Sequence, residues 1–570
     1  MKSIAVEFKN FSFKYRAQAA PTLTGINLTL YKGEKVLIAG RSGSGKSTLV
    51  HLINGLIPFS YDGEISGTLT INGQDPGKLG LFGLSKHVGT VLQDTDSQFV
   101  GLTVGEDIAF ALENDCIVRE ELHRRVNDSA KTVGMAGHLA KSPQALSGGQ
   151  KQRVSMAGVL IDEVSILLFD EPLANLDPAA GKHAMELIDR IHSESGATII
   201  IIEHRVEDVL HCPVDRLVVV DEGKIIGDGP PDAILSSGLL PETGIREPLY
   251  LSALSYAGQQ VDASHHPSSI EKLCLEPFTQ GLRSWYEKTP VSPPPAKTVP
   301  QLVLKNVCFG YRENAPLLKS ISLTLNKGEM VSLAGTNGAG KSTLSKVICG
   351  FEKAQAGEIL LEGRDISKEP IGSRAEKIGL VMQNPNHMII KPMLYDEVAL
   401  GLVSRGMAPS QIKEQVEKTL KICGLYPFRN WPVSALSYGQ KKRVTLASIL
   451  VLEPSILILD EPTAGQDYRH YTEFMEYIVR INRETDTSLF IITHDMHLIL
   501  EYTTRTLVMD DGCLIADDSP AAVLTNDSLI EKASLKRTSL YDLSRRAGIE
   551  DGQAFVQHFI DFDRRKRAHA

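Results

Sequence analysis

The 570-residue chain contains one long sequence pattern twice. FKNFSFKYRAQAAPTLTGINLTLYKGEKVLIAGRSGSGKST at residues 8–48 matches LKNVCFGYRENAPLLKSISLTLNKGEMVSLAGTNGAGKST at 304–343 almost position by position. Lys46 and Lys341 are 295 positions apart. Four later pairs are each 290 positions apart, which leaves five extra residues in the first copy: Gln93 with Gln383, Ser147 with Ser437, Asp170 with Asp460, and His204 with His494. Because each copy is long enough for a domain, the duplication predicts two copies of one fold in tandem.

Each copy opens with alternating strand-like residues and continues into an apolar run, a glycine-rich loop and a helix-compatible stretch. The loops read GRSGSGKS and GTNGAGKS, and both satisfy the phosphate-loop pattern GxxxxGK[ST]. Glycines let backbone N–H groups close around phosphate oxygens, the lysine reaches the β and γ phosphates, and the following serine can ligate Mg²⁺. One such loop can be merely a turn. Two in the same context predict nucleotide sites at Lys46 with Ser47 and at Lys341 with Ser342.

Two carboxylates follow a later apolar run in each copy. SILLFDEP places Asp170 beside Glu171, and SILILDEP places Asp460 beside Glu461. Downstream of a phosphate loop, the aspartate is suited to hold Mg²⁺ through water, and the glutamate is suited to polarise an attacking water. The alternative is a solvated strand end, where adjacent acids are common. The order of the motifs favours the nucleotide role.

A glutamine and a histidine complete the set in each copy. Gln93 in VLQDTDSQF and Gln383 in VMQNPNHMI follow short strands, where an amide can accept from water and bind metal. His204 in IIIIEHR and His494 in FIITHD end later apolar strands, within reach of a γ-phosphate. Alone, such a glutamine is more often a surface residue and such a histidine is more often structural. Their positions among the other motifs favour catalysis.

A glycine-containing helix start lies between these motifs, ALSGGQKQRVSMAG in the first copy and ALSYGQKKRVTLAS in the second. The ordered set of phosphate loop, Gln, LSGGQ or LSYGQ, DEP, ANLD or AGQD, and His resembles the ATP-binding-cassette (ABC) ATPases over nearly the whole chain. The resemblance implies an α/β fold with two tandem P-loop ABC ATPase domains. Each would have an antiparallel β subdomain, a RecA-like mainly parallel sheet core and a helical subdomain. ATP hydrolysis with Mg²⁺ as cofactor is implied as well.

The resemblance further implies that the two halves pair head to tail within one chain and hold two ATP molecules between them. Ser147 and Gly149 of the first signature would then serve the ATP on Lys341, and the second signature would serve the ATP on Lys46. A signature that begins a helix directs a positive dipole end at the γ-phosphate. Tyr438 replaces only the first glycine of the second signature. We therefore predict that this signature works, with Tyr438 as a wall or a partner contact.

Together these motifs define the predicted site, with two tyrosines added because they match the adenine-stacking aromatic of the family. The predicted catalytic residues are Gln93, Glu171, His204, Gln383, Glu461 and His494. The predicted Mg²⁺ ligands are Ser47, Gln93, Asp170, Ser342, Gln383 and Asp460. The predicted nucleotide-binding residues of the first half are Tyr15, Gly40, Ser42, Gly43, Gly45, Lys46, Ser47, Thr48, Ser147 and Gly149. Those of the second half are Tyr311, Gly335, Asn337, Gly338, Gly340, Lys341, Ser342, Thr343, Ser437 and Gly439.

Composition and charge argue against several classes. Apolar stretches such as ATIIII are far shorter than the roughly 20 residues that span a bilayer, so a transporter would need separate membrane subunits. The N-terminal residues lack the apolar block of a signal peptide, which favours the cytosol. A net charge of −9 argues against a nucleic-acid partner, and seven single cysteines argue against a disulfide framework or a zinc site. We expect the basic end DRRKRAHA to be a solvated tail, with contact to anionic lipid as the alternative.

The segments after the two glutamines indicate a subfamily. QDTDSQFVGLTVGEDIAFALEN and QNPNHMIIKPMLYDEVALGL resemble the energy-coupling factor (ECF) ATPases of vitamin and metal uptake, although Asp94–Thr95 and His387 depart from the usual Q-N-P-x-x-Q. The resemblance implies a peripheral position on the cytoplasmic face of the cell membrane. It implies a transmembrane T-type coupling subunit and a small substrate-binding S-type membrane subunit as partners. Segments 94–100 and 384–390 would dock on the T subunit, with ordinary core packing as the alternative. Fused two-cassette versions suggest thiamine or hydroxymethylpyrimidine as the substrate.

Two other classes have tandem ATPase domains. Soluble tandem cassettes that act on the ribosome or DNA resemble this chain, but they have a long charged helical linker, or cysteine-rich or zinc clusters. Here the linker is proline-rich and the chain is acidic. A tandem ATPase of a sugar importer is the closer alternative, and the ECF-like segments distinguish it.

Domain boundaries follow from the repeat and from the proline-rich stretch EKTPVSPPPAKTVP at 287–300, which should be an extended, semi-rigid spacer. REPLYLSALSYAG after the first copy resembles RTSLYDLSRRAG after the second, so each half has a short tail that we expect to be helical. The predicted segments are a first ABC domain at 1–240, a helical extension with the linker at 241–300, a second ABC domain at 301–528 and a C-terminal extension at 529–570.

Overall fold

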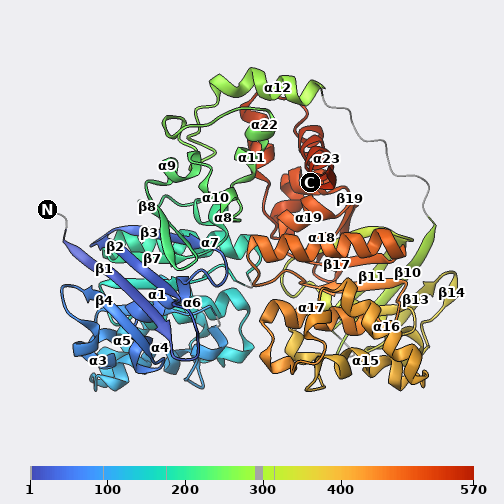
Figure 1. The fold of residues 1–570 in the computed structure, drawn as a ribbon, viewed down its shortest axis with the longest axis horizontal. Helices are drawn as coiled ribbons and strands as arrows, with labels where there is room; N and C mark the ends of the chain where they lie inside the picture. Colours follow the sequence, from blue (N-terminus) through green and yellow to red (C-terminus); the bar gives the residue numbers. More distant parts are fainter. Residues whose placement is uncertain (1–2, 94, 175, 289–298, 313–314, 570) are drawn as a thin grey trace. The chain divides into compact units, whose positions relative to one another are not determined.

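A computed structural model of the protein describes residues 3–93, 95–174, 176–288, 299–312 and 315–569. The chain forms two compact units, one of Met1–Trp285 with Asp467–Arg469 and one of Tyr286–Gln466 with His470–Ala570. Figure 1 shows the elements of each unit along the chain. Most of the predicted spacer 287–300 lies outside the described residues, and so does Asp94 of the segment expected to dock.

The first unit contains an antiparallel sheet and a mainly parallel sheet. The antiparallel sheet has the order β2–β1–β4, with β1 (Ile4–Tyr15), β2 (Leu23–Tyr31) and β4 (Gly63–Ile71). The second sheet has the order β5–β6–β7–β3–β8–β9, and its β8–β9 pair is antiparallel. Its strands are β3 (Lys35–Gly40), β5 (Val88–Val91), β6 (Ile166–Asp170), β7 (Thr198–Ile202), β8 (Arg216–Asp221) and β9 (Lys224–Gly229).

The central strands of the parallel sheet place the motifs together. KVLIAG, ILLFD and TIIII are buried along their whole length, as expected for strands of a parallel sheet that is covered on both faces. Asp170 at the end of β6 pairs with Ile202 at the end of β7, and Ile38 of β3 pairs with the same residue. Because parallel strands run in one direction, the residues that follow them meet at one edge of the sheet.

The second unit repeats this plan with one more short strand. Its antiparallel sheet has the order β11–β10–β13–β14, with β10 (Pro300–Phe309), β11 (Leu318–Asn326), β13 (Ala356–Leu361) and β14 (Arg364–Asp365). Its main sheet has the order β15–β16–β17–β12–β18–β19 and is parallel except for β18–β19. These strands are β12 (Met330–Gly335), β15 (Ile378–Val381), β16 (Ile456–Asp460), β17 (Ser488–Ile492), β18 (Arg505–Asp510) and β19 (Cys513–Asp518).

Helices surround the sheets of both units. Those of the first unit are α1 (Lys46–Ile53), α2 (Leu56–Phe59), α3 (Pro76–Ser85), α4 (Val104–Asn114), α5 (Arg119–Thr132), α6 (Gly148–Leu160), α7 (Pro178–Ser195) and α8 (Val206–Val209). Their second-unit counterparts are α13 (Lys341–Cys349), α14 (Ile371–Arg374), α15 (Leu394–Ser404), α16 (Pro409–Ile422), α17 (Tyr438–Leu450), α18 (Tyr468–Thr485) and α19 (Met496–Tyr502). α3 is longer than α14, and α2 has no counterpart helix. Both differences lie between Lys46 and Gln93, where the first copy has its five extra residues. The predicted fold class is confirmed.

A helical extension follows each ATPase core. The first contains α9 (Pro231–Ser236), α10 (Leu239–Glu242), α11 (Leu249–Tyr256) and α12 (Thr279–Lys288), and the second contains α20 (Pro520–Thr525), α21 (Asp527–Lys532), α22 (Ser539–Arg546) and α23 (Gly552–His569). The expectation that the basic end DRRKRAHA is a solvated tail is wrong, because it forms the end of the last helix, α23, where Arg564 donates to the carbonyls of Leu500, Glu501 and Thr503 and Arg567 pairs with Glu501. In Figure 1, α9–α11 lie at the end of the first unit opposite α3–α5. No helix in the described part of the chain is long and apolar enough to cross a membrane.

Candidate functional site: two phosphate loops with acid–histidine pairs

Both phosphate loops join a buried strand to the start of a helix. The first lies between β3 and α1, and the second lies between β12 and α13. Gly45 and Gly340 precede the two helices with φ of 105° and 98°, a conformation that side chains with a Cβ rarely adopt. A Cβ at Gly45 would lie 2.6 Å from Cδ2 of Leu23. The loops therefore need glycine where the backbone turns its N–H groups toward a phosphate.

Each loop lysine folds back over its own loop. Nζ of Lys46 donates to the carbonyls of Gly40 and Arg41 at 2.7 and 2.8 Å. Nζ of Lys341 makes the equivalent bonds to the carbonyls of Gly335 and Thr336 at 2.8 and 2.9 Å. Burial lowers the pKa of Lys46, and the charge of Glu171 opposes that effect. The lysine is thus preorganised above the backbone that would hold the β and γ phosphates.

The aspartates at the ends of β6 and β16 fit a magnesium ion. Oδ1 of Asp170 is buried and has no hydrogen-bond partner among the described residues. Burial, together with the charge of Glu171, raises the pKa of Asp170 to about 6. Asp460 accepts a hydrogen bond from the Ser342 hydroxyl, and burial raises its pKa as well. A buried carboxylate oxygen without a partner, beside a phosphate loop, suits a hard cation held by oxygen ligands.

The remaining predicted Mg²⁺ ligands are Ser47, which is exposed at the start of α1, and the two glutamines after β5 and β15, both exposed. The described residues contain no group of three His, Cys, Asp or Glu side chains suited to a metal. Proteins commonly hold Mg²⁺ through one or two carboxylates together with substrate phosphates, and Asp170 and Asp460 each supply one carboxylate. Asp170 with Ser47 and Asp460 with Ser342 would hold the ion, which would neutralise phosphate charge.

In the first unit the structure brings Gln93, Glu171 and His204 together. Nε2 of Gln93 donates to Oε2 of Glu171 at 2.5 Å, and Nδ1 of His204 lies 3.9 Å from Oε1. Burial raises the pKa of Glu171. A carboxylate with a raised pKa accepts a proton more readily, as water activation requires.

In the second unit the acid–histidine contact is closer. Nδ1 of His494 lies 2.7 Å from Oε1 of Glu461, and the Thr493 hydroxyl donates to Oε2 at 3.4 Å. Gln383 lies at the end of β15 and is exposed. Glu171 and Glu461 both have φ near 47°, in the left-handed region, and their N–H groups donate to the carbonyls at the ends of β7 and β17. The roles assigned to these residues from sequence stay predictions.

The two signatures begin helices α6 and α17 with the same capping box. Ser147 accepts from the Gln150 N–H at 3.4 Å, and the Gln150 side chain accepts from the Ser147 N–H at 3.0 Å. Ser437 and Gln440 make the same pair of bonds at 3.2 and 2.9 Å. The first-turn N–H groups of each helix have no intrahelical acceptor, so they remain suited to a phosphate.

The predicted adenine-stacking tyrosines differ in exposure. The hydroxyl of Tyr15 lies 3.2 Å from that of Thr48 on α1, and its ring packs edge-on against Phe13 and Tyr61. Tyr311 is 58% exposed and touches Phe309 edge-on. The ring of Tyr311 therefore has the more accessible face.

Sequence reasoning missed two buried charged residues next to these motifs. Glu203 is fully buried at the end of β7 and accepts from the N–H groups of Leu173, His204 and Arg205. Thr493 has this position in the second unit. Lys442 is buried in α17 where the first half has Gln152. The sequence shows a charged residue at each position, Glu203 in EHR and Lys442 in GQKKR, but it does not show which backbone groups these side chains contact.

We expect Asp170→Asn to stabilise the nucleotide-free protein at pH 8. The folded-state pKa of Asp170, about 6, lies above the ordinary 3.8. The contribution of this carboxyl to the free energy of unfolding is therefore fully present below pH 3.8 and is lost as the pH rises through 6. Removing the charge should raise the free energy of unfolding by up to about 3 kcal/mol at pH 8 and by about half as much at pH 5. Urea unfolding at both pH values measures this, with exposed Glu120→Gln as the control. No gain at pH 8 would contradict the burial argument.

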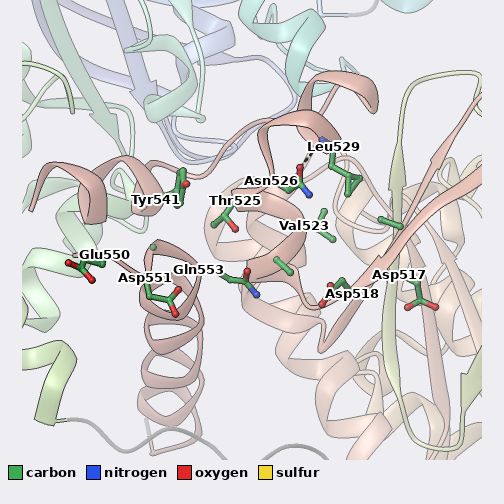
Figure 2. Close-up of a pocket in the computed structure, with 13 residues that line it drawn as sticks. Asp517, Asp518, Val523, Thr525, Asn526, Leu529, Tyr541, Glu550, Asp551 and Gln553 are labelled. Carbon is green, nitrogen blue, oxygen red and sulfur yellow. Dashed lines mark hydrogen bonds between the residues drawn. The ribbon is translucent and has the colours of Figure 1, made fainter. Parts of the chain in front are cut away.

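A separate hollow of about 610 Å³ lies in the C-terminal extension of the second unit. Figure 2 shows its acidic residues around the start of α23 and the end of β19. Asp517, Asp518, Glu550 and Asp551 line it, together with the hydroxyl-bearing Tyr541. Four carboxylates repel phosphate, so this hollow is unsuited to ATP.

Duplicated phosphate loops, strand-end acids and helix-capping signatures on RecA-like sheets define a tandem ABC-type ATPase. A family model described as "ABC transporter" matches residues 23–174 and 318–464, and one described as "ATP-binding cassette cobalt transporter" matches 237–309. The chain belongs to the ABC transporter ATP-binding proteins, a family that hydrolyses ATP. The resemblance and the ATPase activity predicted from sequence are therefore confirmed.

Relatives named as ABC transporter ATP-binding proteins match along the whole chain. One from Clostridium perfringens is 55% identical over 562 residues, covering 99% of each chain. Another from Enterococcus faecalis is 55% identical over 568 residues, covering 100% of each chain. Among solved structures, cbiO1 from Clostridium perfringens, part of the ABC transporter complex cbiONQ, is 32% identical with a TM-score of 0.39, covering 44% of this chain and 98% of that one.

Proposed function

We propose that the protein is the energising ATPase of an ECF-type importer of a vitamin or another micronutrient, bound at the cytoplasmic face of the membrane. The observation that carries this is the match of residues 237–309 to the family model described as a cobalt transporter cassette. That match covers the extension after the first ATPase core and continues into β10. It is independent of the motifs shared by all ABC ATPases.

The segments after Gln93 and Gln383 support membrane docking. Short 3-10 helices, η1 (Thr95–Gln98) and η6 (Pro385–His387), are followed by apolar residues on the surface. Val100 and Leu102 are 65% and 82% exposed, and Ile390 is 75% exposed. Exposed apolar side chains beside the nucleotide-sensing glutamines suit contact with membrane subunits of the T and S types.

In the mechanism we propose, two MgATP bind at composite sites between the halves. In each site the glutamate carboxylate accepts a proton from water while the water oxygen attacks the γ-phosphorus and the bond to ADP oxygen breaks. Lys46 and Lys341 hold the β and γ phosphates, and His204 and His494 orient the acids and reach the γ-phosphate. Closure on ATP and reopening after hydrolysis would move the membrane partner.

The transported substrate is proposed at the level of class. The cobalt-transporter description favours metal or vitamin uptake. Thiamine or hydroxymethylpyrimidine remains a prediction from the fused architecture, and the tandem ATPase of a sugar importer remains the alternative.

Purification of the tagged chain from detergent-solubilised native membranes should recover one T-like subunit and one small substrate-binding membrane protein. We expect Val100→Asp with Ile390→Asp to reduce that recovery about tenfold or more, because both place a charge on an apolar contact surface. Val299→Asp, which changes a residue that is 68% exposed elsewhere, is the control. Mass spectrometry identifies the partners. Recovery of ribosomal proteins, of sugar-importer subunits, or of no membrane protein would contradict the proposal.

A further inference from the structure

Lys442 lies in the second signature helix, α17, and is only 4% exposed. A buried ammonium is unfavourable unless polar groups surround it. Its Nζ donates to the carbonyl of Pro462 at 3.0 Å and to that of Ala464 at 2.9 Å. The ring of Tyr438, one helical turn earlier, lies 5.4 Å from the same Nζ, a cation–π distance. Two carbonyls and an aromatic face thus satisfy the charge.

The two carbonyls belong to the segment directly after Glu461. This glutamate has φ of 48°, a conformation that a non-glycine residue keeps only where its surroundings fix the backbone. Its own N–H donates to the carbonyl of Ile492 at 2.9 Å, which anchors it to β17. Lys442 fixes the chain one and three residues later. The glutamate is therefore held from the sheet on one side and from the signature helix on the other.

The first half has a different arrangement at the same positions. Gln152 occupies the place of Lys442, and its amide donates to the carbonyl of Pro172. Gly148 stands where Tyr438 stands, so no ring covers the amide. The first half has a neutral donor to one carbonyl and a glycine above it, whereas the second half has a cation that donates to two carbonyls and a tyrosine above it. The two differences lie at residues that contact each other in the second half.

The surroundings of Lys442 leave its side chain protonated at neutral pH. Burial, the larger effect, lowers the pKa of Lys442 to about 8, and the charge of Glu461, which faces it from the end of β16, opposes that effect. On the same helix, Arg443 pairs with Glu473 at 3.1 Å.

We propose that Lys442 is a positioning residue for ATP hydrolysis in the second half. It fixes the backbone after Glu461, so that this carboxylate stays aligned with the attacking water, and it joins that alignment to the helix that Ser437 caps. Tyr438 covers the ammonium, which explains why a tyrosine replaces the first signature glycine. The inference rests on the proposed role of Glu461 in water activation.

The test uses the full chain with Lys442→Met, Lys442→Gln and Lys442→Arg. Steady-state kinetics should show that Lys442→Met lowers hydrolysis in the second half about tenfold, so that total kcat falls toward the rate of the first half alone, and that KM for ATP stays within about twofold, because alignment and not binding is lost. Lys442→Arg keeps a charged donor and should recover hydrolysis in the second half to within about threefold of its original rate. Lys442→Gln is the variant expected to fold, because the first half uses glutamine there. Lys441→Met is the control, because it changes the preceding lysine, which is only partly buried.

The same variants should be compared by vanadate trapping of a labelled photoreactive ATP, with a protease site engineered into residues 287–300 to separate the halves. We expect the label on the half containing Lys341 to fall about tenfold relative to the label on the other half. An equal loss on both halves, a raised KM, or unchanged kcat in both Lys442→Met and Lys442→Gln would overturn the inference. Glu461→Gln is the reference. If it abolishes trapping on its half and the Lys442 variants do not, only the inference fails; if it leaves trapping unchanged, the proposed role of Glu461 fails first.

Discussion

Replacing Glu171 and Glu461 together by glutamine is expected to lower ATP hydrolysis about 100-fold or more and to leave ATP bound. The amide keeps the size of the side chain and loses the ability to take a proton from water. The structure supports this choice of residues: each acid sits after a buried strand and beside a histidine, at 3.9 Å in the first unit and 2.7 Å in the second. In each single variant, the site that contains the altered acid should retain unhydrolysed ATP.

Phosphate release measures the rate, and filter binding of radiolabelled ATP measures retention. Glu414→Gln, an exposed carboxylate on α16, is the matched control and should leave both unchanged. Full turnover at the altered site in either single variant would show that its glutamate does not activate water. Loss of turnover together with loss of ATP would indicate a binding defect instead.

Lys46→Ala and Lys341→Ala are each expected to weaken ATP binding at one site about 100-fold. A buried ammonium that donates to phosphate contributes roughly 1.5–3 kcal/mol, and every 1.4 kcal/mol is tenfold in affinity. Both lysines are almost fully buried and are held over their loops by two carbonyls, so they are already in position for the ligand. Alanine removes the donor and the charge together.

Equilibrium titration with a fluorescent ATP analogue should change from two tight sites to one in each single variant, and no tight site should remain in the double variant. Lys353→Ala removes an exposed lysine shortly after α13 and is the control. Two tight sites in both single variants would contradict the assignment. This result also separates binding from chemistry, because the glutamine variants above keep ATP.

The two halves share one fold, but they differ in the charged residues near the acids that follow β6 and β16. Glu203 adds a fully buried carboxylate to the first half, where the second half has Thr493. Lys442 adds a buried cation to the second half, where the first has Gln152. Burial is the main reason that the pKa values of Asp170 and Glu171 are raised, and the charge of Glu203 adds to this effect. We expect the two sites to hydrolyse ATP at unequal rates, which site-resolved trapping would measure.

The duplication, the fold class and the motif residues could all be predicted from the amino-acid sequence. Short contiguous strings encode these features: a glycine-rich loop between a strand and a helix folds locally, and runs of β-branched residues such as TIIII favour buried strands. The family could be predicted as well, because the ordered set of motifs is long and specific. Which strands are neighbours, and hence why Gln93, Glu171 and His204 meet, follows from the parallel order β5–β6–β7–β3.

The contacts of the side chains between the motifs became visible in the three-dimensional structure and not before. Lys442 contacts carbonyls 20 and 22 residues further along the chain, and Glu203 contacts the N–H of a residue 30 positions earlier. Such contacts depend on how helices and strands pack, so no local pattern specifies them. In the sequence Tyr438 was an isolated departure from the signature. In the structure it covers a buried charge, because an α-helix places residues four apart on the same face.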